Sequence, residues 1–303
     1  MKHTPLFSGD AKTHDLTQHR AAGRKSTWVS VAVNLVLTVG QVATGIFAGS
    51  QALVADGIHS LSDLLSDFVV LLAGRHSHKA ADADHAYGHL RYENAASLAL
   101  GGLLLAVSAG MLWAAFGKIQ APAQAVHQLA LWTALATLAI KEGLFRYLLA
   151  VAHRVRSSLL AANAWHARSD AASSLVVALG IGGNLLGFPL LDPIAALVVG
   201  LMIGRMGWRF FWNALNDLMD RAVSSEEAAA IAATLRATPG VMGIHDLRTR
   251  RMGDMTLVDV HLELDARQSV AEGHRIAVLA RQRVLEAHRV LDVMTHVDPV
   301  EER

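Results

Sequence analysis

The sequence predicts an all-α membrane domain of six transmembrane helices, followed by a smaller α+β domain. Of its 303 residues, 52% are hydrophobic and only 17% are charged, which is too apolar a balance for an ordinary soluble domain. Six apolar stretches each supply the roughly 20 residues that a spanning helix needs. After about residue 213 the pattern changes to charged, amphipathic segments of helix and strand length.

The membrane domain is expected over residues 27–212, after a polar N-terminal tail, 1–26, that has no apolar segment of its own. Basic residues in this tail, in the loops after the second and fourth spans, and at the end of the sixth predict that these parts face the cytoplasm. Both termini are then cytoplasmic. The expected spans are 27–48, 52–74, 94–116, 128–150, 158–186 and 190–212.

The C-terminal segment, 213–303, alternates between helix and strand signals. A helix is predicted to begin at the caps Ser224–Ser225, and two strands meet at Gly253–Asp254, a hairpin signal. A second helix at about 270–287 and a last strand complete the order αββαβ. Because apolar and polar residues alternate along the second strand, we expect a ferredoxin-like sheet with helices on one face and polar side chains on the other.

Ionisable residues inside two expected spans repeat one pattern. His59 and Asp63 are four apart in the second span, and His166 and Asp170 are four apart in the fifth. Residues four apart share a helix face. Two imidazoles and two carboxylates would complete the tetrahedral shell that Zn²⁺ favours and cancel its charge. Since such groups within a span usually mark an ion pathway, the pattern predicts a divalent-metal site; the alternative is a structural polar seam.

Three more charged residues in these spans are less specific. Asp56 and Asp67 lie on about the same helix stripe as the predicted ligands, one turn to either side. They are interpreted as carboxylates that line an entrance or, equally well, as residues solvated at the interface. Arg168 projects from the face opposite His166, towards another helix or the membrane surface.

Two groups outside the spans have metal-ligand chemistry. In the first, spacings of three and four predict one shared helical face. In the second, two residues share a face of the last strand and a third lies on the polar face of the strand before it. Solvated surface residues are the alternative in both places. The groups are Asp82, His85 and His89 in a loop, and His261, His296 and Asp298 in the sheet.

Cysteine is absent, so disulfides and thiolate ligands are excluded and every candidate ligand is nitrogen or oxygen. This ligand chemistry disfavours Cu(I) and is compatible with Zn²⁺, Fe²⁺, Mn²⁺, Co²⁺ and Cd²⁺. The formal charge of +1 does not suggest nucleic acid as a partner.

From about residue 27 onward, the chain resembles the cation diffusion facilitator family, and within it the bacterial ferrous-iron and zinc efflux branch. The paired ligands, "ADADHAYGHLRYE", "GIHDLRTR", "DVHLEL", "EGHRIA", "THVDP" and "LMDRA" carry the resemblance. It implies a homodimeric, proton-coupled antiporter of divalent metal in the bacterial inner membrane. It also adds His245 and His274 to the sheet group, makes Asp298 a bridge between two metal ions, and pairs Arg91 with Asp220 as a contact at the membrane boundary.

One difference from the pattern of the resembling exporters concerns which metal is carried. Similar exporters often carry Asp where this chain has His59, and the His-Asp/His-Asp set is associated in the family with zinc-selective members. The expected substrate is therefore Zn²⁺, with Fe²⁺, Mn²⁺, Co²⁺ or Cd²⁺ as alternatives. An intramembrane metallohydrolase is disfavoured because no HExxH occurs, so we expect no enzyme. A metal-sensing membrane protein that does not transport is the remaining rival.

Overall fold

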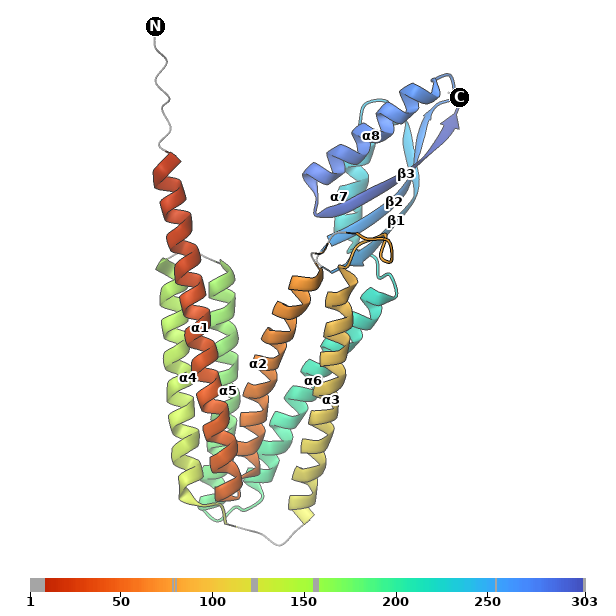
Figure 1. Ribbon diagram of the computed structural model, residues 1–303. Helices are drawn as coiled ribbons and strands as arrows, with labels where there is room; N and C mark the ends of the chain where they lie inside the picture. Colours follow the sequence, from red (N-terminus) through yellow and green to blue (C-terminus); the bar gives the residue numbers. More distant parts are fainter. Residues whose placement is uncertain are drawn as a thin grey trace. The chain divides into compact units, whose positions relative to one another are not determined.

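A computed structural model of the chain describes residues 9–77, 79, 81–120, 125–154, 158–253 and 255–301. Six long helices come first (Figure 1): α1 Gly9–Ala48, α2 Gln51–Ser77, α3 Arg91–Gln120, α4 Gln128–Arg154, α5 Ser158–Leu185 and α6 Leu191–Leu218. The C-terminal elements follow as α7 Ser225–Arg236, β1 Gly243–Met252, β2 Met255–Asp265, α8 Val270–Ala287 and β3 Val290–Val300. The predicted fold class and the order αββαβ are confirmed.

The six long helices cover the six predicted spans, although α1 already begins at Gly9, inside the predicted tail. Within the described ranges, three stretches are long and apolar enough to cross a membrane by composition alone: Trp28–Ala48 of α1, the whole of α3 and the whole of α6. The other three long helices, α2, α4 and α5, supply the buried polar groups discussed below, which reduces their apolar character.

The chain divides into two compact units, Met1–Phe68 with Leu103–Gly207, and Val69–Gly102 with Trp208–Arg303. In the first unit α4 packs against α1 and α5. Helix α2 approaches α1 closely because Gly57 lacks a side chain: a Cβ there would lie 2.6 Å from Cγ2 of Val42. This close approach brings the middle of α2 next to Gln41 of α1.

In the second unit, helices α7 and α8 cover one face of a three-stranded sheet of order β1-β2-β3 (Figure 1). Strand β1 runs antiparallel to β2, and β2 runs parallel to β3. Helix α7 begins where predicted, because the Ser224 hydroxyl accepts a hydrogen bond from Glu227 N at 3.2 Å. The core combines the inner face of β2 with both helices: Val258, Val260, Leu262, Leu264, Ile231, Leu235, Ala280 and Val284.

The outer face of this sheet is polar, as predicted. In the strand register His261 of β2 lies opposite His245 of β1 on one side and His296 of β3 on the other. Three imidazoles therefore lie side by side on neighbouring strands.

Candidate metal centres

Helices α2 and α5 bring three of the four residues predicted in the spans together. One ligand atom from each of His59, Asp63 and Asp170 lies within 4.8 Å of the others. His59 is only 6% exposed, and its Nδ1 is 3.9 Å from Oδ2 of Asp63. Among the described residues that nitrogen has no hydrogen-bond partner, which is unusual for a buried polar atom. A buried imidazole nitrogen beside two carboxylates is a donor set that fits a divalent cation.

The fourth predicted residue, His166, lies one turn before Asp170 on α5. Its side chain is exposed, and it is not among the three residues whose ligand atoms lie within 4.8 Å of one another. The structure therefore brings three protein donors together, and the fourth predicted ligand, His166, lies one turn away on α5.

Asp56 neither lines an entrance nor is solvated at the interface, so both interpretations are wrong. The side chain is completely buried, and four donors surround its carboxylate. Gln41 Nε2 donates at 2.5 Å and Ser174 Oγ at 2.7 Å. Ser173 Oγ lies at 3.2 Å and the Lys141 ammonium at 3.4 Å. The sequence signal for Lys141 was a lysine in the middle of an apolar span, but only tertiary packing supplies its partner.

Arg168 contacts aromatic rings. Its guanidinium carbon is 4.9 Å from the ring centroid of Phe145 on α4 and 5.3 Å from that of Trp165 on α5. This cation–π arrangement stabilises the guanidinium and fits the expectation that Arg168 faces another helix. The Asp67 side chain lies outside the described residues.

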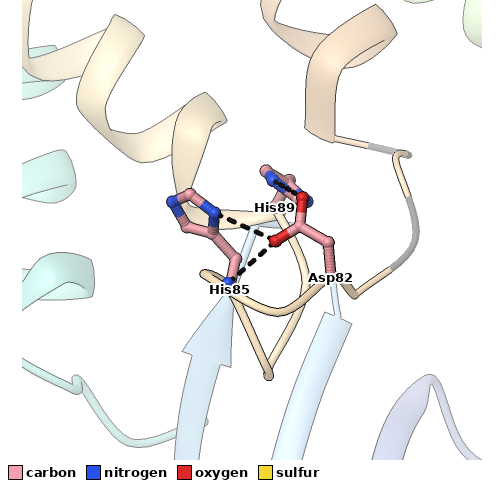
Figure 2. A group of neighbouring side chains, drawn as sticks. All are labelled: Asp82, His85 and His89. Atoms are coloured by element: carbon pink, nitrogen blue, oxygen red, sulfur yellow. Dashed lines mark hydrogen bonds and ion pairs between the residues drawn. The ribbon is translucent and has the colours of Figure 1, made fainter.

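The loop before α3 brings Asp82, His85 and His89 together (Figure 2). Oδ1 of Asp82 accepts a hydrogen bond from His85 N at 2.9 Å and lies 3.3 Å from His85 Nδ1. Oδ2 lies 3.4 Å from Nε2 of His89. The His89 side chain is 6% exposed, and its Nδ1 has no hydrogen-bond partner in the part of the chain that the structure describes. A turn closed by the Gly88 N–H on His85 O produces this convergence, so the predicted helical face is wrong although the three residues do meet.

A lysine competes for the loop carboxylate. Lys79 Nζ lies 3.0 Å from Oδ2 of Asp82. This contact and the His85 N–H hold the pKa of the Asp82 carboxyl well below its usual range. Asp82 therefore remains a negatively charged donor throughout the physiological pH range.

The outer face of the sheet holds a second cluster of imidazoles around one carboxylate. Oδ2 of Asp298 is 2.8 Å from His261 Nδ1 and 3.0 Å from His245 Nε2, and Oδ1 is 3.4 Å from His296 Nε2. The hydrogen bond from His261, followed by the charges of the three rings, lowers the pKa of Asp298. Both carboxylate oxygens thus face histidines, as a bridging ligand requires.

One neighbour of this cluster was missed. Asp246 lies 3.6 Å from His245 Nδ1 and forms a second group with His245 and His261. Strict alternation would put Asp246 on the other face of β1, but a bulge after His245 and a φ of 48° turn it back. His274, predicted for the same site, is exposed on α8 and belongs to neither described group.

The predicted pair of Arg91 and Asp220 is present. The Arg91 guanidinium contacts the Asp220 carboxylate and also lies 3.5 Å from the Leu218 carbonyl oxygen. The Leu218 carbonyl belongs to the last residue of α6, so Arg91 links the start of α3 to the end of α6.

Residues 27–219 match the model of the cation efflux transmembrane domain, and residues 223–300 match that of the cation efflux protein, cytoplasmic domain. Metal tolerance protein C1 of Arabidopsis thaliana is 34% identical over 294 residues, covering 91% of this chain and 62% of that protein. This chain thus spans less than two thirds of the plant relative. The manganese efflux system protein MneS of Bacillus subtilis is 30% identical over 282 residues, covering 93% of this chain and 97% of that protein.

Among solved structures, the metal-bound C-terminal domain of the CzcD transporter from Thermotoga maritima is 31% identical to part of this chain. The match covers 24% of this chain and 87% of that domain, with a TM-score of 0.24.

Proposed function

Because the chain belongs to the cation efflux, or cation diffusion facilitator, family, we propose that it exports divalent metal ions, foremost Zn²⁺, by proton antiport. The observation that carries the proposal is the convergence of buried His59 with half-buried Asp63 and Asp170 from two helices. Members of the family are membrane-embedded transporters, so the proposal contains no enzymatic reaction.

The transport site is proposed to consist of His59, Asp63, His166 and Asp170. Two carboxylates balance the charge of a divalent ion, which makes its passage through the membrane interior tolerable. Two nitrogens and two oxygens suit tetrahedral Zn²⁺. Fe²⁺, Mn²⁺, Co²⁺ and Cd²⁺ accept the same donors and remain the alternative substrates, and one relative is named as a manganese efflux protein.

Proton coupling follows from the chemistry of these ligands. Metal requires neutral imidazole and ionised carboxylate, so metal binding expels protons and protonation expels metal. A site that opens to the cytoplasm loads metal, and the same site opened to a more acidic exterior takes up protons and unloads. Rocking of helices around a fixed site would alternate the access.

The cytoplasmic clusters are proposed to be regulatory or structural metal sites. Asp82, His85 and His89 would form the loop site. The sheet site would comprise His245, His261, His274, His296 and Asp298, with Asp298 bridging two ions. The match to the cytoplasmic domain of the family supports a homodimer, and the basic loops support the orientation with both termini in the cytoplasm. The membrane proposed is a bacterial inner membrane.

Flux into proteoliposomes tests the proposal. Inside-out vesicles with an acidic interior should accumulate Zn²⁺ more strongly than vesicles without a pH gradient, and Asp170→Ala should abolish the accumulation. A panel of Zn²⁺, Fe²⁺, Mn²⁺, Co²⁺ and Cd²⁺ ranks the substrates. Metal binding without any flux would instead favour the rival function, a membrane protein that senses metal.

A further inference from the structure

A buried ion pair lies beside the proposed transport site without belonging to it. Asp56 of α2 is fully buried, and Lys141 of α4 is 2% exposed. The Lys141 ammonium lies 3.4 Å from Oδ1 of Asp56 and 3.5 Å from the backbone carbonyl oxygen of Asp170. Asp56 is three residues before His59 on α2, so the pair adjoins ligands on both helices.

Two serines of α5 repeat this bridge. Ser173 Oγ lies 3.2 Å from Oδ1 of Asp56 and 2.7 Å from the Asp170 carbonyl oxygen. Ser174 Oγ lies 2.7 Å from Oδ2 of Asp56 and 3.3 Å from the same carbonyl. Three donors from two helices therefore reach both the carboxylate of Asp56 and the backbone of Asp170. Gln41 of α1 occupies the remaining side of the carboxylate.

Stability alone is a weak explanation for this arrangement. Burying two charges costs desolvation free energy that their attraction only partly returns, and apolar residues of similar volume are often as stable. The ionic arrangement adds directional contacts. Charged and hydroxyl donors at short distances from Asp56 fix the translation and rotation of α2 relative to α5. The ligands His59 and Asp63 are on the first helix, and Asp170 is on the second.

The pair also bears on the charge of the site. Asp56 is a third carboxylate near Asp63 and Asp170, and without a counter-charge it would compete with them for the cation. Lys141 compensates it. The metal ion then meets a site with two negative charges, which matches a divalent ion.

We propose that Asp56 and Lys141 are positioning residues, which set the register of α2 against α5 and limit the metal site to two uncompensated carboxylates. The inference depends on the proposed function for its transport readout. The proposal distinguishes Asp56 and Lys141 from the metal ligands. Removing a ligand eliminates metal binding, whereas disturbing the pair displaces ligands that are still present.

Transport kinetics of the full chain in proteoliposomes provide the first test, with Asp56→Asn, Lys141→Met and the double variant. Each single variant leaves the pair without one of its charges, so its KM for Zn²⁺ should rise at least tenfold. The double variant should return to within about threefold of the unaltered KM, because it is neutral and the introduced amide oxygen still accepts hydrogen bonds from the serines. The matched control is Glu142→Gln with Arg146→Met, which removes an exposed ion pair on the same helix and should leave KM unchanged.

A merely structural pair gives a different result. Variants that fold less well lower the maximal rate through fewer active molecules, at an unchanged KM. That outcome, or an unchanged KM in both single variants, overturns the proposal. If a single variant fails to fold, Lys141→Arg decides: it keeps the charge on a bulkier group, so KM should rise, and an unchanged KM counts against positioning.

A distance measurement tests the register without transport. The chain has no cysteine, so cysteines placed at the exposed Leu61 of α2 and Leu175 of α5 are the only thiols for spin labels. Labelled chain diluted with unlabelled chain should give one narrow distance. The distribution should shift or broaden in Lys141→Met and recover in the double variant; no change overturns the proposal. Absence of metal flux in the unaltered chain would contradict the proposed function. The distance between the labels would still test whether Asp56 and Lys141 set the register of α2 against α5.

Discussion

Nδ1 of His261 on β2 lies 2.8 Å from Oδ2 of Asp298 on β3, across two parallel strands of the C-terminal sheet. Because His245 and His296 converge on the same carboxylate, loss of Asp298 would leave three imidazoles without the group that joins them. Metal bound here would stabilise the domain only while this arrangement is intact.

We therefore predict that Zn²⁺ raises the melting temperature of the C-terminal domain in the full chain. At 100 times the dissociation constant, binding stabilises the folded state by ~2.7 kcal/mol, which raises the melting temperature of a domain of this size by roughly 10 to 20 °C. Calorimetry with Zn²⁺ and with chelator measures the shift. His261→Ala combined with Asp298→Ala should remove it, and His288→Ala, whose ring contacts Thr234, should not. A shift that survives the first double substitution contradicts the sheet site.

Asp63→Ala and Asp170→Ala should each abolish transport. Either change removes one of two charges that balance the cation, and the expected loss in flux exceeds about 100-fold, equivalent to more than ~2.7 kcal/mol. Flux assays on protein whose expression and melting temperature match the unaltered chain check this. Glu142→Gln, an exposed carboxylate on α4, is the matched control. Near-normal transport in either ligand variant would remove these residues from the site.

His59→Asp should change which metal is carried. The substitution adds one negative charge to the empty site and replaces nitrogen by an oxygen donor that can bind through two atoms, which accommodates a larger ion. We expect Zn²⁺ to be preferred over Cd²⁺ in the unaltered chain and clear Cd²⁺ transport in the variant. The ratio of the two fluxes is the measurement. An active variant with an unchanged ratio means that helix packing, and not this ligand, sets selectivity.

Lys79→Met should strengthen metal binding at the loop site. The ammonium 3.0 Å from Asp82 competes with a cation for the same oxygen, so its removal should raise Zn²⁺ affinity several-fold. Titrations in a background of Asp63→Ala, Asp170→Ala, His261→Ala and Asp298→Ala, which removes the proposed transport and sheet sites, isolate the loop. Arg275→Met, which removes an exposed cation of α8, is the control. An affinity that stays constant or falls would show that Lys79 does not compete.

The pH dependence of that loop site follows from the lowered pKa of Asp82. The carboxylate contributes stability above its unfolded pKa, and this contribution is lost only as pH falls through the lower folded value. Between about pH 5 and 8 Asp82 therefore stays ionised, so its carboxylate remains available to a metal ion throughout this range. NMR of the Asp82 side-chain carboxyl carbon across this range checks its charge. A carboxyl signal that titrates between about pH 5 and 8 would contradict the lowered pKa.

Arg91→Ala is expected to reduce flux several-fold while changing stability little. The ion pair with Asp220 is exposed on both sides, and such pairs contribute less than about 1 kcal/mol. A larger effect on transport than on stability would indicate a hinge between α3 and α6. Exchanging the two charges, Arg91→Asp with Asp220→Arg, should restore part of the flux. Unaltered transport in both Arg91→Ala and Asp220→Ala would show that the exposed ion pair has no role in transport.

Local sequence patterns were sufficient to predict the helices and strands. Hydropathy and periodicity predicted six long helices and αββαβ, and Ser224 caps α7 as its side chain predicts, because these features depend on neighbours within a few residues. The spacing of four also places His59 with Asp63 on one face of α2 before any packing is known.

Tertiary structure decided which charges meet. Asp56 and Lys141 are 85 residues apart, and no local pattern indicates that one neutralises the other inside the helices. Asp246 turns towards His245 because a bulge interrupts the alternation of β1, and Asp82 reaches its two histidines through a turn and not a helix. Sequence periodicity determines which face of a helix or strand is polar, whereas packing between distant segments determines what each polar group contacts, since a buried charge must find its partner wherever the fold brings one.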